Sequence, residues 1–393
     1  MAASFDSRRV AHVQRIAVLR PNAVGDFIFL LPALAALRAA YPQAHITLLG
    51  RRWHVEFLTG RPGPWDEVIA MPAAPGVGAA PQAEIDAAAI ERFVADMRAR
   101  RFDIALQLYG GGRHSNPFVQ RLGARVSVGA QADDAPPLDR TLRYAWMRNE
   151  RTRLLEVVGL VGATPVDLSP ALALTAQDHA ALAAALALPP GPFVVLQPGA
   201  SDPRRRWSAQ RFAAVGDALA AAGAAVIVQG DAAERALTAE VAQCMSHPAI
   251  DVGGRLGLGA LAALLARAAL LVSNDTGPLH LGHALGCPSI GLFWWMNLHT
   301  AEPLALRSMR TFYSARTHCP VCGAGNVFGG CEHAVSFIDD IPLEPVRDEA
   351  LAMVSTAVRQ KLPVTGAAPA ALQAEAARTP LAIPGDPWQR PVT

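Results

Sequence analysis

Long uncharged apolar runs are missing from this sequence, and cysteine is scarce. No stretch of about 18 apolar residues occurs, so we expect no membrane-spanning helix. Residues 1–10 carry Asp6, Arg8 and Arg9 without an apolar core, so we expect no secretory signal. The five cysteines are few and odd in number for 393 residues, which favours the reduced thiols of a cytoplasmic protein. The near-neutral net charge of +2 gives no signal for nucleic-acid binding.

Two common nucleotide motifs are also missing. No G-x-G-x-x-G follows the first predicted strand, which argues against a dinucleotide-dependent dehydrogenase. No G-K-[ST] phosphate loop occurs either. What the chain does have is an apolar fraction of 51% against 17% charged residues, which is typical of a globular protein. Its length suits two α/β domains.

Short apolar runs alternate with helical patterns along the chain, and this alternation is typical of domains built on parallel sheets. In the first half the sequence predicts strands at residues 16–20, 46–49, 67–70, 104–108 and 126–128. It predicts helices at residues 83–100 and 141–162, and another through Leu31, Leu34 and Leu37 that ends near Pro42. Because proline cannot sit in an unbroken helix interior, we expect Pro32 near the start of that helix or at a kink.

The same rhythm repeats after an extended, proline-bearing segment at residues 164–174, which we interpret as an interdomain linker. The second half predicts strands at residues 193–197, 225–229, 249–252, 270–273 and 289–293. Its predicted helices span residues 175–186, 209–222, 232–245, 258–268 and 345–359. We therefore expect domains at 1–170 and 171–345, a helix at 346–360 that packs back across their boundary, and a mobile Ala/Pro-rich tail at 361–393.

A strand end followed by a helix start is visible in the segment SNDTGPLHLGHALG. Asp275, Thr276 and Gly277 form the predicted turn, and Pro278 suits the first helical position. Backbone amides at such a helix start favour an anion such as a diphosphate, and His280 could hydrogen-bond it one turn later. Asp275 would repel a phosphate, so we expect it to accept bonds from sugar hydroxyls or to cap the helix. A plain capped helix without a ligand is the alternative.

A second loop, QPGASDPRRRW, follows the strand predicted at residues 193–197. It passes through Gly199 and Ser201 to three consecutive arginines, of which Arg205 and Arg206 are the candidates for ligand contact. Cationic side chains beyond a strand end can neutralise a diphosphate in place of a metal ion. A solvated basic turn is the alternative interpretation of this loop.

Two acidic residues follow other predicted strands. Asp26 comes just after the first strand, where a carboxylate facing the cleft could take a proton from an attacking hydroxyl. Glu234, together with Gly230, follows the strand predicted at residues 225–229 and could accept bonds from ribose hydroxyls. Taken singly, each acid is more often a helix cap or a surface charge, so both depend on the neighbouring motifs.

Two further segments are ambiguous by themselves. GGGR, at residues 110–113, is as consistent with a structural turn as with a binding loop. Cys319, Cys322 and Cys331 include one C-x-x-C pair, with His318 or His333 as a further candidate ligand. Because the second half of a zinc motif is incomplete, the sequence favours free or transiently paired thiols over a structural zinc ion. We assign these cysteines no catalytic role.

Together these motifs resemble glycosyltransferase family 9, whose best-known members are the ADP-heptose:lipopolysaccharide heptosyltransferases. The likeness runs from about Arg15 to about Val354, most of the chain. The segment LRPNAVGDF resembles the opening of that family, with Asp26 at its catalytic aspartate. QPGASDPRRRW resembles its donor-phosphate loop, in which Arg205 stands where lysine is usual. SNDTGPLHLGHALG is similar to its most recognisable motif.

The resemblance implies a role for each matching residue. Donor contacts are expected from Gly199, Ser201, Arg205, Arg206, Gly230, Glu234, Asp275, Thr276, Gly277, Pro278 and His280. Gln107 departs from the family, because many members have an aspartate there. Arg113 and Ser115 still match the basic and hydroxyl positions of the loop that faces the acceptor.

The family implies a GT-B fold, in which two Rossmann-like parallel-sheet domains face a central cleft. Residues 1–170 would form the acceptor side and residues 171–345 the nucleotide-sugar side. The implied activity is an inverting, metal-independent transfer of a sugar, heptose from ADP-heptose, onto a hydroxyl of a lipopolysaccharide-core or related glycan. No cofactor is required beyond the ADP-linked donor.

The implied partners are the nucleotide sugar and a glycolipid or oligosaccharide acceptor, without nucleic acid. We expect a cytoplasmic protein, with at most peripheral contact with the inner face of the inner membrane. Two other functions stay open at this point. One is a paralogue that binds a nucleotide sugar without catalysis, and the other is a nucleotide-sugar epimerase of similar two-domain build.

Overall fold

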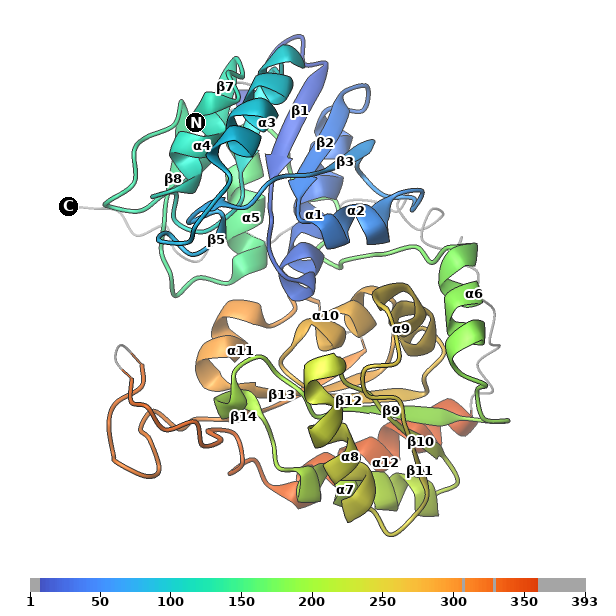
Figure 1. Ribbon diagram of the computed structural model, residues 1–393. Coiled ribbons are helices and arrows are strands. Elements are labelled where there is room, and N and C mark those ends of the chain that lie inside the picture. The colour runs from blue at the N-terminus through green and yellow to red at the C-terminus, as the bar shows by residue number, and fades with distance from the viewer. Residues whose placement is uncertain (1–7, 306–307, 328–329, 360–393) are drawn as a thin grey trace, which may run out of the picture. The chain divides into compact units, whose positions relative to one another are not determined.

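Two six-stranded parallel sheets form the framework of the protein (Figure 1). The computed structural model describes residues 8–305, 308–327 and 330–359, so the predicted tail at 361–393 lies outside the described residues. The first sheet has the order β3-β2-β1-β6-β7-β8. Its strands are β1 (Arg15–Leu19), β2 (His45–Gly50), β3 (Glu67–Ala70), β6 (Ile104–Gln107), β7 (Val126–Gln131) and β8 (Arg140–Arg143).

The second sheet repeats this topology with the order β11-β10-β9-β12-β13-β14. Its strands are β9 (Phe193–Gln197), β10 (Ala225–Val228), β11 (Ala249–Asp251), β12 (Leu270–Asn274), β13 (Ser289–Trp294) and β14 (Met309–Ser314). Counted within each half, both orders are 3-2-1-4-5-6, the order of doubly wound nucleotide-binding sheets. The strand order reverses between β1 and β6 in one sheet and between β9 and β12 in the other. Ligands of such sheets bind beyond the strand ends at these two points.

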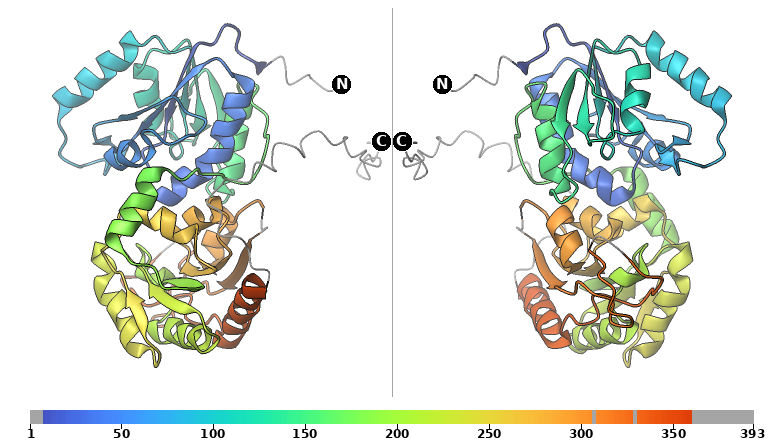
Figure 2. Two further views of the ribbon diagram at one scale, coloured as in Figure 1. Left: turned by 90° about the vertical axis from the view of Figure 1, so that its right-hand side faces the viewer. Right: turned by 90° about the vertical axis from the view of Figure 1, so that its left-hand side faces the viewer.

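Helices cover both faces of each sheet, as the side views in Figure 2 show. In the first half they are α1 (Val24–Ala40), α2 (Arg52–Leu58), α3 (Ala87–Ala99), α4 (Ser115–Arg121) and α5 (Glu150–Gly159). In the second half they are α6 (Ala176–Ala185), α7 (Ala209–Ala221), α8 (Arg235–Cys244), α9 (Leu258–Leu265), α10 (Gly277–Ala284), α11 (Trp295–Ala301) and α12 (Leu343–Arg359). Two short 3₁₀ helices, at Pro203–Arg205 and Ala232–Glu234, and a small pair of strands, β4 (Ala74–Pro75) and β5 (Gly78–Ala79), complete the described elements.

The burial of β1 explains why its sequence is almost wholly apolar. Ile16 and Val18 pack in one apolar cluster with α1 and α5, whereas Ala17 and Leu19 pack in another with α3 and α4. Successive strand residues point to opposite faces, so a sheet covered on both faces needs apolar residues at every position. The chemistry is therefore left to the loops beyond the strand ends.

A buried ion pair and an apolar cluster join the two halves. The cluster is continuous from α1 and α5 in the first half to α9 and α10 in the second. Nη1 and Nη2 of Arg61 lie 2.7 and 2.8 Å from the two carboxylate oxygens of Asp178, and both side chains are almost fully buried. Burial alone would raise the pKa of Asp178, but hydrogen bonds from Arg61 and Thr175 hold it below its ordinary value. Asp178 therefore stays ionised, and its buried negative charge depends on Arg61 for neutralisation.

Replacing Arg61 with leucine is expected to lower the free energy of unfolding by about 3–5 kcal/mol, because it leaves the Asp178 carboxylate buried without its cation. Urea denaturation followed by circular dichroism measures this loss. The double variant Arg61→Leu/Asp178→Leu serves as the control and should recover most of it. Equal destabilisation of the single and double variants would contradict the ion-pair explanation.

Several predicted elements differ from those observed. Of the two positions expected for Pro32, the helix start is wrong, because Pro32 lies in the interior of α1. There the buried apolar surroundings of the helix outweigh the lost hydrogen bond. The stretch predicted as one helix at residues 141–162 is divided, because β8 pairs with β7 at the edge of the first sheet before α5 begins. The predicted helix at 83–100 begins only at Ala87, since the carboxylate of Asp86 caps it by accepting from Ala89 N.

The C-terminal helix α12 packs differently from the expectation. Its main contacts are with α7 and β12, and its buried residues Val346, Ala350 and Val354 belong to a cluster of the second half. Packing across the boundary was expected, but the apolar face of α12 covers the second sheet instead.

Residues 163–175 contain no helix or strand, which agrees with the linker predicted at 164–174. The domain boundary at 170/171 stays a prediction. Within the described residues no helix combines the length and apolarity that a bilayer crossing demands.

Candidate active site

The predicted motifs occupy the points where the strand order reverses. Asp26 lies in the first turn of α1, which follows β1, the strand that pairs with β6, and the arginine loop follows β9. Asp275 follows β12, which pairs with β9 so that Ser273 lies beside Gln197. The structure therefore brings two loops from distant parts of the second half to the same sheet edge, as the sequence predicted.

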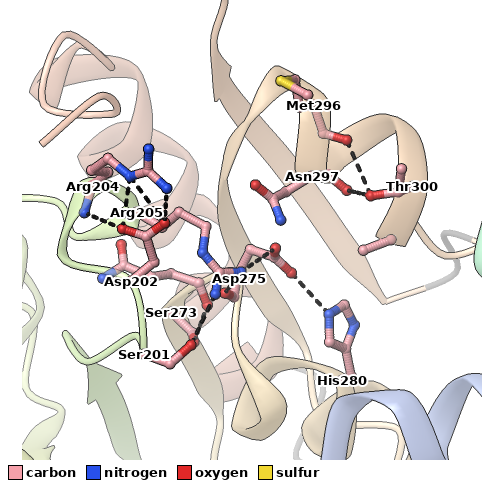
Figure 3. Close-up of polar contacts among 12 residues, drawn as sticks. Ser201, Asp202, Arg204, Arg205, Ser273, Asp275, His280, Met296, Asn297 and Thr300 are labelled. Atoms are coloured by element: carbon pink, nitrogen blue, oxygen red, sulfur yellow. Dashed lines mark hydrogen bonds and ion pairs between the residues drawn. The ribbon is translucent and has the colours of Figure 1, made fainter. Parts of the chain in front are cut away.

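Arg205, Asp275 and His280 form a connected row of polar side chains (Figure 3). Nη1 of Arg205 lies 3.3 Å from Oδ2 of Asp275, and its Nη2 donates to Ser201 Oγ at 3.0 Å. The other oxygen of Asp275 lies 2.9 Å from Nε2 of His280. Asp275 thus contacts a cation on one side and an imidazole on the other, and it does not cap α10, whose N-cap is Thr276.

The partners of His280 decide its tautomer. Its Nδ1 lies 3.4 Å from Nη2 of Arg151, and a guanidinium can only donate, so Nδ1 is the acceptor and Nε2 carries the proton towards Asp275. Burial lowers the pKa of His280, which favours the neutral ring. Burial would raise the pKa of Asp275, but the hydrogen bond from His280 and the charge of Arg205 outweigh it and hold that pKa low. Asp275 is therefore ionised beside a neutral imidazole.

Two glycines allow α1 and α10 to meet at their N-termini. A Cβ added to Gly25 would lie 3.2 Å from Cδ2 of His280, and one added to Gly277 would lie 3.2 Å from Cβ of Val24. Side chains at either position would push the two helices apart. The close approach places Asp26, the neighbour of Gly25, near His280, whose ring experiences its charge. Pro278 is the second residue of α10, one position after the predicted first one, and still lies in the first turn.

Asp26 is held by a buried arginine. Nη2 of Arg20 lies 3.1 Å from Oδ1 of Asp26, and Nη1 lies 2.7 Å from Oε1 of Glu150. The Arg20 side chain is fully buried, while that of Asp26 keeps 34% of its surface exposed. Glu150 also pairs with Arg153, and it stays ionised because its two arginines outweigh the effect of burial on its pKa. Arg20 therefore has fixed partners on both sides, and Asp26 keeps an accessible oxygen.

Replacing Glu150 with glutamine is expected to lower kcat about tenfold, because Arg20 loses the charge that fixes it and Asp26 loses its orientation. The KM for the donor should change little, since Glu150 contacts no part of the arginine loop. Steady-state kinetics separate the two effects. Glu156→Gln, the same change on the same helix, is the matched control. A loss confined to KM would contradict this positioning role.

Arg151 links the site to the second half. Its guanidinium lies 4.1 Å from the ring centre of Phe29 and donates to backbone oxygens of Ala301 and Glu302. Phe29 in turn meets the ring of His280 edge-on at 4.6 Å. Burial lowers the pKa of Arg151 to about 10, so it remains charged at neutral pH. Together these contacts fix His280 from the side of the first half.

Gly199, Gly230 and Glu234 come together beyond β9 and β10. A Cβ on Gly199 would lie 2.0 Å from the carboxylate of Glu234, and one on Gly230 would lie 3.0 Å from its Cβ. Oε2 of Glu234 accepts from Gln197 Nε2 at 3.2 Å and from Asp231 N at 3.0 Å. The grouping agrees with the sequence prediction, although one carboxylate oxygen is already engaged by protein donors.

The remaining predicted contacts differ in their availability. Nε of Arg206 donates to Ala200 O at 2.9 Å, which ties its side chain to its own loop. Arg113 is exposed and lies 3.3 Å from Asp134. Ser115 is buried, and its hydroxyl donates to Tyr109 O and accepts from Gln107. In this structure Ser115 is therefore engaged internally and not available to an acceptor, because Gln107 and Ser115 together fix the turn after β6.

Four residues of the site were not found from the sequence: Arg20, Phe29, Glu150 and Arg151. Arg20 gave the one usable signal, since a charged residue directly after a buried strand requires a partner. Glu150 and Arg151 begin α5, more than 120 positions further along the chain, and gave no such signal. Figure 3 also shows Met296, Asn297 and Thr300 of α11 in this region, where Thr300 Oγ1 donates to Met296 O at 3.1 Å.

A comparison with models of known protein families shows to which family the chain belongs. The family model described as glycosyltransferase family 9 (heptosyltransferase) matches residues 90–326, more than half of the chain. The chain belongs to glycosyltransferase family 9. The family resemblance seen in the sequence is thereby confirmed, and this family 9 protein is a glycosyltransferase by descent. The matched range includes the Arg205 and Asp275 motifs, whereas the Asp26 segment precedes it.

Individual relatives of this family 9 chain are distant. Lipopolysaccharide heptosyltransferase 3 of Escherichia coli is 25% identical over 293 residues, which cover 68% of this chain and 80% of the relative. Lipopolysaccharide heptosyltransferase 2 of Salmonella typhimurium is 24% identical over 297 residues, covering 71% and 82%. The solved structure of E. coli ADP-heptose lipopolysaccharide heptosyltransferase II has a TM-score of 0.68 at 19% identity, covering 88% of this chain and all of that one. The two six-stranded parallel sheets match this structure, so the GT-B fold is confirmed.

Proposed function

We propose that this family 9 glycosyltransferase transfers heptose from ADP-heptose to a hydroxyl of a lipopolysaccharide-core or related glycan, with inversion at the anomeric carbon. The observation that carries the proposal is the meeting of α1 and α10 at Gly25 and Gly277. It sets an accessible carboxylate from the first half beside the cationic helix start of the second. Heptose and ADP as substrates are supported by the names of the relatives.

Asp26 acts as the general base in this proposal. Its exposed oxygen accepts the proton of the acceptor hydroxyl as that oxygen forms its bond to the anomeric carbon. The bond from the anomeric carbon to the diphosphate oxygen breaks at the same time, and ADP leaves with the electron pair. Attack from the face opposite the leaving group inverts the anomeric configuration. Arg20 keeps Asp26 in place through their 3.1 Å contact.

The developing charge on the diphosphate is stabilised by the second half. The backbone amides of Thr276 and Gly277 lie at the positive N-terminal end of α10. Pro278 has no N–H to donate and contributes only by starting the helix. Arg205 adds a full positive charge beside them, and His280 with Asp275 fixes that arginine. Such preorganised donors replace the metal ion that other transferases use to neutralise a diphosphate.

The remaining predicted contacts divide between the two substrates. Gly199, Ser201 and Arg206 contribute to the phosphate side, and Gly230 and Glu234 to the nucleoside. Residues 171–345 would thus hold the donor and residues 1–170 the acceptor, with exposed Arg113 as an acceptor contact. Acceptors of this kind are glycolipids or their oligosaccharides, so we place the reaction in the cytoplasm, with at most peripheral contact with the inner membrane.

A product assay tests the function. The purified protein is incubated with ADP-heptose and a lipopolysaccharide core lacking its terminal heptose, and mass spectrometry follows the acceptor. We expect the acceptor mass to rise by one heptose residue, with NMR showing an inverted anomeric centre and added Mg²⁺ or Mn²⁺ leaving the rate unchanged. Donor conversion without acceptor would indicate an epimerase. Tight ADP binding without any product would indicate a non-catalytic paralogue, and either result would overturn the proposal.

A further inference from the structure

Three cysteines and one histidine converge in the segment that follows β14. Sγ of Cys319, Cys322 and Cys331 and a ring nitrogen of His333 all lie within 4.8 Å of one another. Three thiolates and one imidazole form the Cys₃His donor set that structural zinc ions take. In residues 8–305, 308–327 and 330–359, no second group of three or more His, Cys, Asp or Glu side chains has metal-ligand spacing.

The backbone around the first two cysteines is shaped for a bound ion. Cys319 N donates to Ala324 O and Gly323 N donates to Cys319 O, both at 2.9 Å, so the C-x-x-C-G run closes into a tight hairpin. Gly323 has φ +73°, a value that favours glycine after the second cysteine. Val321 N points at Cys319 Sγ from 3.4 Å, the arrangement by which backbone amides support a metal-bound thiolate.

We propose that Cys319, Cys322, Cys331 and His333 bind one thiophilic divalent ion in tetrahedral geometry, zinc by the chemistry of the donors. The sequence favoured free thiols because only one C-x-x-C pair was visible in it. The fold supplies the missing half by bringing Cys331 and His333 to the hairpin. His318, the other candidate from the sequence, instead pairs its Nδ1 with Thr317 Oγ1 at 2.8 Å.

The proposed metal site lies next to the loop that carries Arg205, so a bound ion would affect the stability of that loop. Asn326 lies 3.9 Å from Cys331 Sγ through its Nδ2, and its Oδ1 lies 3.5 Å from Nη1 of Arg204. A few residues beyond the cluster, Phe337 N donates to Arg204 O at 2.7 Å and Ser336 Oγ donates to Arg206 O. The same segment therefore supports the loop on both sides of Arg205. A bound ion would make this segment, and through it the arginine loop, more rigid without contacting substrate.

Metal analysis of the full-length protein tests the site directly. Protein purified without chelators should contain about one equivalent of zinc per chain, and the double variant Cys319→Ser/Cys322→Ser less than about 0.1. Cobalt-exchanged protein should show the visible bands of tetrahedral cobalt–thiolate coordination, absent in the variant. Cys244→Ser, which removes an exposed cysteine outside the cluster, is the matched control and should keep the ion.

The loss of the ion should also lower the melting temperature, while the ADP affinity of the same samples reports on the proposed function separately. The proposal would be overturned by full-length protein that contains no stoichiometric metal and whose cluster thiols react with a thiol reagent as fast as Cys244. Such thiols would be free to bind an ion and yet hold none. A disulfide between Cys319 and Cys322 in freshly purified protein, found by mass spectrometry, would overturn it as well. Neither result depends on whether the protein transfers sugar.

Discussion

Replacing Asp26 with asparagine is expected to lower kcat by about 100- to 10,000-fold, the range of a lost general base. Asparagine keeps the size of the side chain and can still pack beside Arg20, but its amide cannot accept the proton of the attacking hydroxyl. The affinity for ADP should stay within about threefold, because the contacts proposed for the nucleotide lie in the other half of the chain. Initial rates and isothermal titration calorimetry measure the two quantities.

The matched control for this substitution is Asp96→Asn, an aspartate on the exposed face of α3. It should leave both quantities unchanged. If the Asp26 variant instead lost ADP binding and kept its single-turnover rate, Asp26 would be a structural or binding residue. The general-base assignment would then have to be withdrawn.

Replacing Arg205 with alanine is expected to lower kcat/KM by about 100- to 1,000-fold, because the leaving diphosphate loses a fixed cation. ADP binding should weaken as well, since ADP carries the same negative charge. Arg205→Lys should recover part of the loss, as it keeps the charge without the planar fork of the guanidinium. Steady-state kinetics on the three proteins, at one fixed ionic strength, measure this series.

The neighbouring arginine provides the contrast. Arg204 is turned away from Asp275 and is held by Asp202, with Nη2 and Nε lying 2.7 and 3.0 Å from its two oxygens (Figure 3). Arg204→Ala should therefore cost much less activity than Arg205→Ala. Equal losses for the two variants would mean that the loop as a whole matters, and that Arg205 has no particular role at the diphosphate.

The candidate site was largely predictable because its residues belong to loops or first helical turns that follow strands. Asp26 follows β1, Arg205 lies in the loop after β9, and Asp275 comes directly after β12. Arg205 and Asp275 follow neighbouring strands of one parallel sheet, so strand prediction alone brings these two segments to one edge. Asp26 follows a strand of the other sheet, and only the packing of α1 against α10 brings it near them. The predicted strands matched in number except for the edge strands β8 and β14 and the short pair β4 and β5. Edge strands are half exposed and carry weak apolar patterns.

What the sequence could not give was the environment of each side chain. Ser115 matched a family position, yet it is buried and bonded to Gln107 and Tyr109. Arg206 stands beside Arg205 in the sequence, yet its side chain bonds its own loop. Side-chain direction in a loop, or at the first residue of a helix such as Ser115, depends on the local backbone, for which sequence spacing holds no regular period.

The sequence by itself determined the two successive parallel sheets and the segments after their strands that carry Asp26, Arg205 and Asp275, because apolar periodicity and turn residues are local properties. Only the tertiary structure decided that Glu150 would hold Arg20, that Arg151 would reach His280, and that Cys331 and His333 would join the C-x-x-C hairpin. These contacts bridge residues far apart in the chain, or depend on loop geometry. They form where packing of the sheets and their covering helices forces buried polar groups to find partners.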